Sequence, residues 1–548
     1  MKRILTLTIL AALLTSLGLC QGKSPLSANE ALSTLPVQSG GRLKPLDTLA
    51  RESVRLVTGK SRFQGADPII TLLRWWSDPE ATKSAEVIEF RNLALKKELG
   101  LEEDRRWYSF SELAYNDKLN AHREEIHQHL QNEEELHGDE QKIQDLLVKI
   151  NVVHQAMEGH IFQAVPHPEG LKQDWGSFAD LGHQQTIELV APAKQALDEL
   201  REAMLSNDSS KFLQASRNVK SALATIGPVP DESTMSRELR YNKAHPFRTA
   251  WLLYLAGLAI LTFVKAEGRS TGYWAGFSFV VAGFLMHTYG FALRCMIAGR
   301  PPVTNMYESV IWVAFGAVLF ALIFEVISAK RYYLMAASAG AIVCLVLADI
   351  LPTVLDPSIR PLTPVLRSNF WLTIHVLSIT LGYAAFLLAL GLGHIVLWKC
   401  ALKPQQKEII DTLHDAVYRA LQVGVLLLAA GTILGGVWAN YSWGRFWGWD
   451  PKEVWALIAL LGYLAILHGR YAGWLRQFGI SAWSIIAFQG VVMAWYGVNY
   501  VLGAGLHSYG FGTGGVQYVA IYVVIEILYV LWAAAVHKNN QRPAETRQ

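Results

Sequence analysis

The sequence predicts an all-α polytopic membrane protein, with about nine transmembrane helices that follow a mainly helical extracytoplasmic N-terminal domain. Three observations predict this fold class. The composition is 51% hydrophobic and only 17% charged, whereas soluble domains carry about 25% charged residues. Apolar stretches of spanning length follow one another after residue 245. Before that point the chain is polar, and its apolar residues recur at helical spacing.

The first predicted segment, residues 1–22, is a signal peptide or an N-terminal anchor, MKRILTLTILAALLTSLGLCQG. It has a basic start, an apolar centre and small residues near its end, as secretory signals do. Cys20 raises the alternative of a lipoprotein site, although Leu19 stands where that site requires a small residue. Either form of the segment places the residues that follow outside the cytoplasm.

The second predicted domain, residues 25–245, is extracytoplasmic and mostly helical. EVIEFRNLALKKELGLEED and HREEIHQHLQNEEELHGDEQKIQDLLVKINVV place apolar residues at helical spacing on charged backgrounds. Six histidines of this domain lie on polar faces without the spacing of a metal site, so we expect solvated side chains. They are His122, His127, His129, His137, His154 and His160.

The third predicted domain, residues 246–540, contains the apolar stretches. These lie at about 247–265, 273–297, 308–328, 332–351, 371–399, 417–439, 454–473, 480–501 and 516–536. With residues 25–245 outside, most basic clusters fall in cytoplasmic connections, as the positive-inside rule requires. Arg294, Arg300, Arg360 and Arg367 fall on the outer side and are exceptions.

Several classes of function are excluded. The net charge is +3, and no basic stripe with interleaved aromatic residues indicates nucleic-acid binding. The four cysteines, Cys20, Cys295, Cys344 and Cys400, form no CxxC pair, which excludes a thioredoxin-like redox pair and a zinc ribbon. The chain also lacks CxxCH, so it is not itself a c-type cytochrome.

A tryptophan segment, defined here as residues 438–457, joins two predicted spans on the outer side. It includes WGRFWGWDPKEVWAL, with Trp443, Trp447 and Trp449 close together. One interpretation is an interfacial aromatic belt, which is common in membrane proteins. The intervening glycines Gly444 and Gly448 favour another, a platform for a flat apolar ligand, because glycine permits close approach of the backbone.

Asp450 and Glu453 also have a structural interpretation. Asp-Pro-Lys-Glu is a good helix start, with Asp450 at the N-cap and Glu453 at the third helical position. TNMYE, with Asn305 and Glu308, is a weaker version of the same cap. We therefore expect Asp450 and Glu453 to start the helix that fixes the tryptophan segment to the membrane, and we assign no residue as a general acid or base.

Histidines within or beside spans are the other candidates, since an ionisable side chain in the membrane is a functional hypothesis by default. His375 and His507 lie at the outer side, His468 lies toward the cytoplasmic end of its span, and His287 is near the middle of one. His394 and His414 are expected at the cytoplasmic interface.

Two outer histidines beside a tryptophan platform favour a bis-imidazole iron site, because neutral imidazole is the usual axial ligand of haem. A porphyrin offers the flat apolar surface that indoles cover. Its propionates need cationic partners, for which Arg445 and Lys452 are candidates. The alternative is that His375 and His507 are two unrelated loop histidines.

WGRFWGWDPKEVWALI resembles the tryptophan-rich "WWD" signature of the CcsA/ResC-type cytochrome c assembly proteins, the System II haem lyase family. The resemblance covers about 247–536, and RPPVTNMYESVIW is similar to the start of the family's third span. It implies an outward-facing site for haem b under the WWD loop, with His375 and His507 as axial ligands. It also implies a histidine within the membrane, matched by His468, for haem on its way out.

The sequence departs from fused System II synthases, in which a ResB/CcsB-like half with its own spans comes first. LPVQSGGRLKPLDTLARESV resembles instead the extracytoplasmic extension of some members. We therefore expect a separate ResB/CcsB-like membrane subunit as partner, and the second ligand of the inner haem is either one of its residues or His287.

The expected function is cytochrome c biogenesis at the bacterial cytoplasmic membrane. The chain would hold haem among membrane lipid, present it outside and support its thioether attachment to the CxxCH of apocytochrome c, as part of a cytochrome c synthase complex. The alternative is a haem exporter or chaperone without ligase activity.

Overall fold

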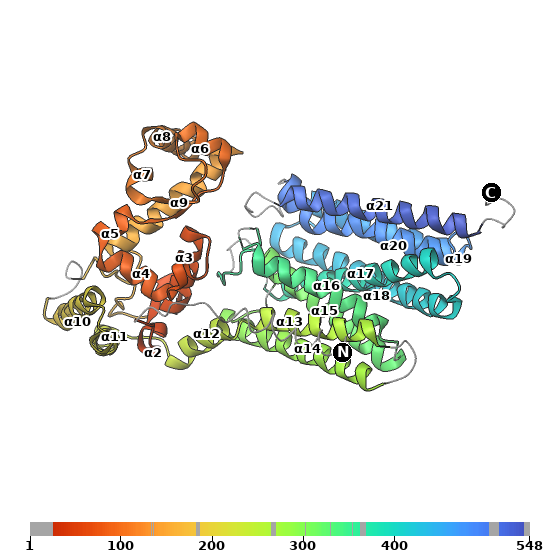
Figure 1. The fold of residues 1–548 in the computed structure, drawn as a ribbon, viewed down its shortest axis with the longest axis horizontal. Helices are drawn as coiled ribbons and strands as arrows, with labels where there is room; N and C mark the ends of the chain where they lie inside the picture. Colours follow the sequence, from red (N-terminus) through yellow and green to blue (C-terminus); the bar gives the residue numbers. More distant parts are fainter. Residues whose placement is uncertain are drawn as a thin grey trace, which may run out of the picture. The chain divides into compact units, whose positions relative to one another are not determined.

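The computed structural model describes residues 26–132, 134, 136, 138–181, 187–264, 270–301, 303–328, 330–352, 354–361, 369–502 and 515–541. The chain divides into two compact units, Met1–Lys243 and Ala244–Gln548. We call them the N-terminal unit and the membrane unit and describe each by itself (Figure 1).

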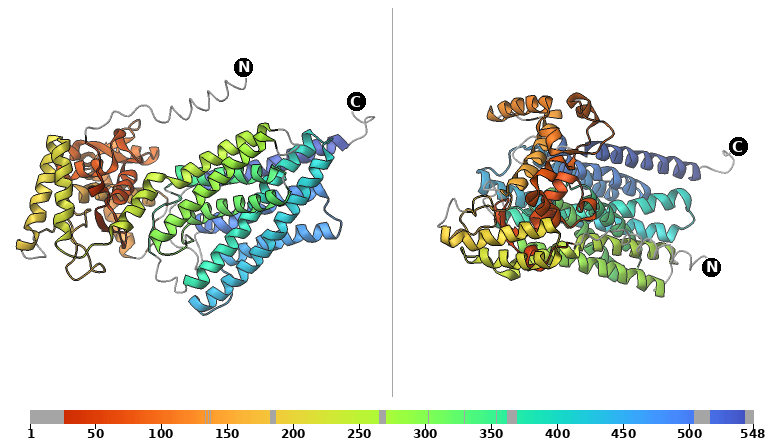
Figure 2. Two further views of the ribbon diagram at one scale, coloured as in Figure 1. Left: turned by 90° about the horizontal axis from the view of Figure 1, so that it is seen from below. Right: turned by 60° about the vertical axis from the view of Figure 1, so that its left-hand side comes forward.

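The N-terminal unit is mainly helical, as predicted. Its helices are α2 (Glu30–Ser33), α3 (Leu46–Thr58), η1 (Phe63–Gly65), α4 (Pro68–Ser77), α5 (Pro79–Ser84), α6 (Leu93–Leu99), α7 (Phe110–Ala114), α8 (Asp117–Gln131), α9 (Asp139–Glu158), α10 (Ile187–Ser206), α11 (Ser209–Ala224) and α12 (Glu232–Ala244). Figure 2 shows α10 and α11 side by side as a helical pair. Most of these helices begin at a side-chain cap, as α8 does at Asn116, whose Oδ1 accepts from Leu119 N.

Two short antiparallel strand pairs were not predicted. They are β1 (Pro36–Ser39) with β2 (Arg42–Pro45), and β3 (Glu86–Glu89) with β4 (Trp107–Ser109). The first turns at Gly40 and Gly41, with φ of 62° and 77°. A glycine pair with positive φ is the usual two-residue hairpin loop, so QSGGR carried a signal for this hairpin.

The N-terminal unit has its own hydrophobic core. Its buried side chains come from most of its helices and from both strand pairs, and include Val54, Ile70, Tyr108 and Val153. Trp76 packs on Phe162 and Phe178 with ring centroids 6.1 and 5.6 Å away. These contacts give this unit a stable base independent of the membrane helices.

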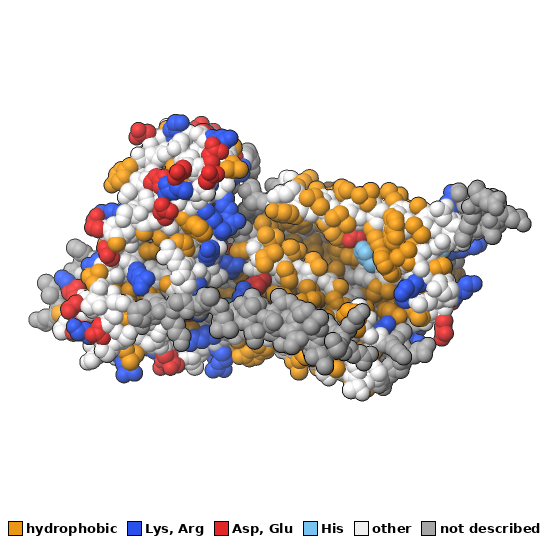
Figure 3. Space-filling model, in the orientation of Figure 1, with side chains coloured by type: hydrophobic (Ala, Val, Ile, Leu, Met, Phe, Trp, Pro, Cys, Tyr) orange, Lys and Arg blue, Asp and Glu red, His pale blue; other side chains and the backbone are white. Residues whose placement is uncertain are grey.

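The membrane unit consists of long apolar helices. They are α13 (Pro246–Phe263), α14 (Thr271–Ala298), α15 (Met306–Ser328), α16 (Tyr332–Ile350), α17 (Asn369–Leu402), α18 (Lys407–Trp443), α19 (Pro451–Tyr471), α20 (Gln477–Val492), the π-helix η2 (Met493–Leu502) and α21 (Val516–Gln541). Within the described ranges, 9 helices are long and apolar enough to cross a membrane. The prediction of an all-α polytopic membrane protein with about nine spans is therefore confirmed. Figure 3 shows hydrophobic side chains over much of this unit's visible face.

Successive spans run in opposite directions, so the connections alternate between two ends of the bundle. We call the end at which α18 finishes and α19 begins the tryptophan end. The starts of α15, α17 and α21 and the end of η2 belong to the same end. This arrangement places His375, close to the start of α17, at the tryptophan end, and His468, close to the end of α19, at the opposite end.

A buried ion network stabilises the tryptophan end. Arg294 Nε of α14 donates to Glu308 Oε1 of α15 over 3.0 Å, and Arg300 Nη1 lies 3.4 Å from Oε2. Arg294 and Glu308 are both 0% exposed. The two guanidinium groups also donate to three backbone carbonyl oxygens, those of Pro357, Ser358 and Arg360. Two of the arginines that broke the positive-inside pattern are therefore structural groups that hold the α16–α17 connection.

We expect Glu308→Gln to destabilise the membrane unit by about 3 kcal/mol, because it leaves two buried guanidinium groups without their carboxylate. Thermal unfolding of the detergent-solubilised protein measures the change. Glu80→Gln, in the exposed pair with Lys83, is the control and should leave the midpoint unchanged. Equal midpoints for Glu308→Gln and the wild type would contradict the proposed role of the network.

Candidate functional site

The tryptophan segment is fixed by the ends of two helices. Gly444, with φ of 72°, ends α18, and Asp450 caps α19. Asp450 Oδ1 accepts from Lys452 N over 3.0 Å, and Glu453 Oε2 accepts from Asp450 N over 3.2 Å. This reciprocal pair is a capping box with proline at the first helical position, so the predicted helix start is confirmed. The weaker cap is also present, since Asn305 Oδ1 accepts from Glu308 N over 2.8 Å.

The two cations of the segment already have protein partners. Arg445 Nη1 donates to Glu453 Oε1 over 3.2 Å, and Lys452 Nζ donates to Asn499 Oδ1 of η2 over 3.1 Å. A side chain at Gly448 would collide with the Arg445 guanidinium, so this glycine makes room for the arginine. Arg445 and Lys452 stay predicted propionate partners, but each would have to share or exchange a hydrogen bond.

Four of the tryptophans form two edge-to-face pairs, with interplanar angles of 69° and 90°, rather than one flat wall. Trp438 is 1% exposed and packs edge-on against Trp443, with centroids 4.6 Å apart. Trp447 and Trp449 are 6.0 Å apart at 90°, and Trp449 is 71% exposed. Trp449 has φ of 59°, in the region that a bulky residue adopts only at a cost of about 1–3 kcal/mol. The fold therefore holds a large indole outward in a strained backbone conformation, which favours a functional role.

His375 of α17 lies against α18 in a defined orientation. Its Nδ1 is 2.8 Å from the carbonyl oxygen of Gly431, and its ring lies parallel to Trp438 at 6.4 Å. A Cβ at Gly435 would lie 2.6 Å from His375 Cε1, so only glycine leaves room for the ring. A carbonyl oxygen only accepts, so Nδ1 carries the proton and Nε2 keeps its lone pair. This is the orientation that a metal-ligating imidazole takes from its backbone partner.

The other predicted histidines lie apart from His375 or outside the described residues. His468, near the opposite end, places Nδ1 2.7 Å from the Leu464 carbonyl oxygen, and its side chain is exposed. His287 is 0% exposed and is enclosed by Tyr254 and three phenylalanine rings, those of Phe247, Phe291 and Phe315. His507 lies outside the described residues.

One polar pair in the membrane unit was missed by the sequence reasoning. His394 of α17, expected at the interface, places Nε2 2.8 Å from Glu526 Oε2 of α21, and its ring stacks on Tyr529. Glu526 is 7% exposed, in a helix that otherwise exposes mostly apolar side chains. A lone glutamate inside the last apolar stretch was the available signal, because a buried carboxylate in a span needs a partner.

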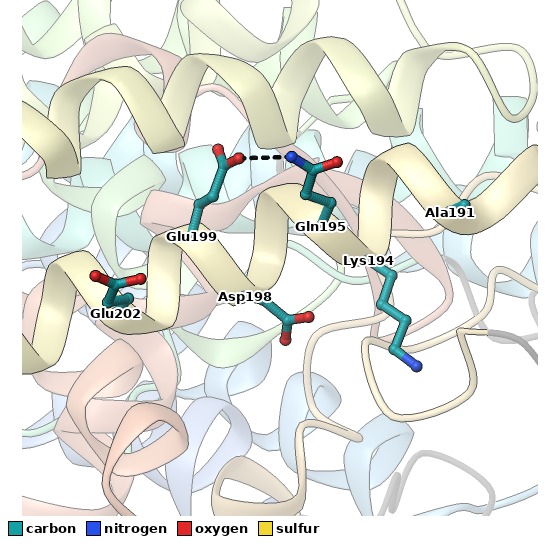
Figure 4. A pocket seen from close by; sticks show the side chains of 6 residues that line it. All are labelled: Ala191, Lys194, Gln195, Asp198, Glu199 and Glu202. Atoms are coloured by element: carbon teal, nitrogen blue, oxygen red, sulfur yellow. Dashed lines mark hydrogen bonds between the residues drawn. The ribbon is translucent and has the colours of Figure 1, made fainter.

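The concave surface along the side of α10 in the N-terminal unit does not suit a porphyrin. Figure 4 shows this pocket, which has a volume of about 420 Å³. Its lining is mostly polar and charged, with Gln195 Nε2 donating to Glu199 Oε1 over 3.0 Å. A flat apolar ligand would find no indole or imidazole among these lining residues.

Fold and site together define a polytopic all-α membrane protein with an oriented histidine and an aromatic connection at one end of its bundle. The family model described as "Cytochrome C assembly protein" matches residues 303–507, which include α15 to η2 and the tryptophan segment. The chain is 36% identical to the cytochrome c biogenesis protein CcsA of Synechococcus sp. strain RCC307 over 263 residues, which is 42% of this chain and 83% of that protein.

Two further relatives are also similar to this chain. CcsA of Chlorella vulgaris is 33% identical over 302 residues, 47% of this chain and 93% of that protein. Protein NrfI of Wolinella succinogenes is 30% identical over 494 residues, 86% of this chain. The chain spans about half of NrfI, since the alignment covers 53% of that protein. The chain belongs to the CcsA family of cytochrome c assembly proteins, and its role lies in cytochrome c biogenesis.

We expect Asp450→Ala to loosen the tryptophan segment and Asp450→Asn to preserve it. Asparagine still accepts at the N-cap, whereas alanine removes the acceptor at a cost of about 1 kcal/mol. Hydrogen–deuterium exchange of peptides from residues 444–456 measures the difference. Faster exchange in the asparagine variant, equal to that in the alanine variant, would show that the charge of Asp450 matters rather than its cap.

Proposed function

We propose that this protein binds haem b at the tryptophan end and supports its covalent attachment to the CxxCH of apocytochrome c. The observation that supports the proposal is the hydrogen bond from His375 Nδ1 to the Gly431 carbonyl, since a ring held in this way would bind iron through Nε2. The family supports the substrate class, since handling of haem is part of cytochrome c assembly.

The described residues fit haem as a substrate. The donor set is a neutral imidazole, which suits iron, and His507 is the proposed second axial ligand. The cradle at Gly435 seats the ring of His375, and the indoles of Trp447 and Trp449 offer apolar surface at the tryptophan end. Arg445 is the proposed propionate partner, because a guanidinium binds a carboxylate in two-point fashion.

The main contribution proposed for the protein is to hold haem and the CxxCH segment in position for the reaction. In each thioether bond a cysteine sulfur bonds to one carbon of a haem vinyl group, and the thiol hydrogen ends on the other carbon. Holding both reactants in an oriented geometry supplies at best about 7–11 kcal/mol toward such a step. The capping box fits this role because it fixes the tryptophan segment rigidly to α19.

We propose that His468 binds haem on its way out. The Leu464 carbonyl fixes the proton on Nδ1 of His468, which leaves Nε2 for iron. The second ligand comes from a ResB/CcsB-like membrane subunit or from His287. The aromatic enclosure of His287 favours the partner, because iron reaches that ring only if several buried side chains move.

The proposed location is the bacterial cytoplasmic membrane, with residues 25–245 on the extracytoplasmic side. The basic connections at the opposite end, which include Lys330, Arg331, Lys403 and Arg470, support this orientation. The N-terminal unit then stands on the side from which apocytochrome c approaches.

We expect the purified protein, expressed with its partner subunit and ample haem, to show a low-spin haem spectrum. His375→Ala should weaken it or convert it to high spin, because one axial ligand is lost. Gly435→Ala should have a similar effect, since the new methyl group displaces the imidazole ring. Absorption spectra of oxidised and reduced samples measure both changes.

Gly462→Ala is the matched control, a glycine in α19 whose Cβ would meet no atom within 4 Å. Its spectrum should equal that of the wild type. No haem in the wild-type complex would overturn the proposed function, and an unchanged spectrum in His375→Ala would remove His375 as a ligand.

A synthase and an exporter differ in their product. We expect co-expression of this chain, its partner and a CxxCH reporter to give a reporter that keeps haem after denaturing electrophoresis. Deletion of residues 40–240 should abolish this product while bound haem remains, since the N-terminal unit is proposed to receive apocytochrome. Haem release without covalent reporter would favour the exporter, and loss of bound haem in the deletion would contradict the role of the N-terminal unit.

A further inference from the structure

The α8–α9 hairpin of the N-terminal unit brings together side chains that bind metals. Glu125 and His129 are four residues apart on α8 and so share one helix face. Glu140, in the first turn of α9, completes a group whose ligand atoms all lie within 4.8 Å of one another. The sequence alone gave no such pattern, because Glu140 comes from another helix.

His129 has a carboxylate near each of its ring nitrogens. Its Nδ1 is 3.2 Å from Glu140 Oε1, and its Nε2 is 3.8 Å from Glu134 Oε2. An imidazole lone pair and a carboxylate oxygen can bind the same metal ion. The positions of His129 and Glu140 therefore allow both side chains to bind one ion.

The neighbouring His122 lies two turns earlier on the same face of α8. Its Nε2 is 2.8 Å from Glu98 Oε1, and its Nδ1 is 3.5 Å from Glu125 Oε2. Glu125 therefore lies within reach of both histidines on this helix face.

We propose that His129, Glu125 and Glu140 bind a divalent transition-metal ion of the zinc class. Imidazole nitrogen with carboxylate oxygens is a common ligand set for zinc, at about 2.0–2.2 Å each. Two atoms that bind one zinc ion are at most about 4.2 Å apart. Rotation of the three side chains would bring the triad from its present spacing of up to 4.8 Å into this range. Residues outside the triad or water would complete the coordination.

The half-exposed position of the triad allows exchange with solvent. The side chains of His129 and Glu140 are 31% and 34% exposed. The ion would join α8 to α9 near the connection between them, since His129 lies in the last turn of α8 and Glu140 in the first turn of α9. The buried residues of α8 are Leu119 and Ile126, so binding would stabilise a helix with little hydrophobic support, by the linkage between ligand binding and folding.

The test uses the full chain in detergent with a purification tag that contains no histidine. Zinc chloride is titrated calorimetrically at about pH 7.5, where the imidazole of a histidine in a short peptide is mostly neutral. The wild type should bind about one zinc ion more than His129→Ala, or bind it about 10-fold more tightly or better. Glu125→Gln should lose the same ion while it keeps its shape and hydrogen-bonding capacity.

His154→Ala is the matched control. His154 also forms an i,i+4 contact with a glutamate, Glu158 at 3.3 Å, but does not belong to the triad. It should bind zinc as the wild type does. Equal isotherms for the wild type and His129→Ala would overturn the site, as would an equal loss in His154→Ala. Absence of zinc binding in the wild type would also overturn the proposal.

Discussion

The close approach of α17 and α18 is the constraint on which the candidate site depends. The two helices meet along glycines, since a Cβ at Gly431 would lie 2.6 Å from Ile379 N and one at Gly435 equally close to His375 Cε1. Small residues are the general means by which membrane helices bring their backbones together. Here the approach also exposes a backbone carbonyl to a histidine ring, so the helix contact and the ligand orientation have one cause.

The buried carboxylates of Glu308 and Glu526 follow a second rule, that charge is paired where lipid offers no hydrogen bonds. Glu308 is enclosed by Arg294 and Arg300, and Glu526 pairs with His394. The first pairing shapes the connection before α17, and the second attaches α21 to α17. Both place charge in the interior as part of the architecture. In the tryptophan segment, by contrast, the side chain of Arg445 stays 29% exposed, although its partner Glu453 is only 10% exposed.

The distinction between structure and function is clearest at Asp450 and Glu453. Both carboxylates act as caps, and Glu453 also binds Arg445 and the amide of Gly448. Both carboxylates are therefore engaged in hydrogen bonds that hold the connection between α18 and α19. In the proposed haem site, aromatic faces and imidazole nitrogens would contact the ligand, which suits the handling of a flat metal complex better than acid–base catalysis.

The sequence by itself determined the class of fold, the nine spans and the helix start at Asp450. Spanning length and capping are local properties, and a local signal is enough to predict them. The family signature around the tryptophans is also local, and the comparisons confirm the family.

Only the tertiary structure decided which atoms meet. His375 and Gly431 are 56 residues apart, Lys452 and Asn499 are 47 apart, and His394 and Glu526 are 132 apart. Packing also decides whether the tryptophans form a flat wall or two edge-to-face pairs. It likewise brings Glu125 and Glu140, from two different helices, close together. Such contacts depend on the distance, crossing angle and rotation of neighbouring helices. The apolar periodicity of one helix does not specify which other helix packs against its apolar face.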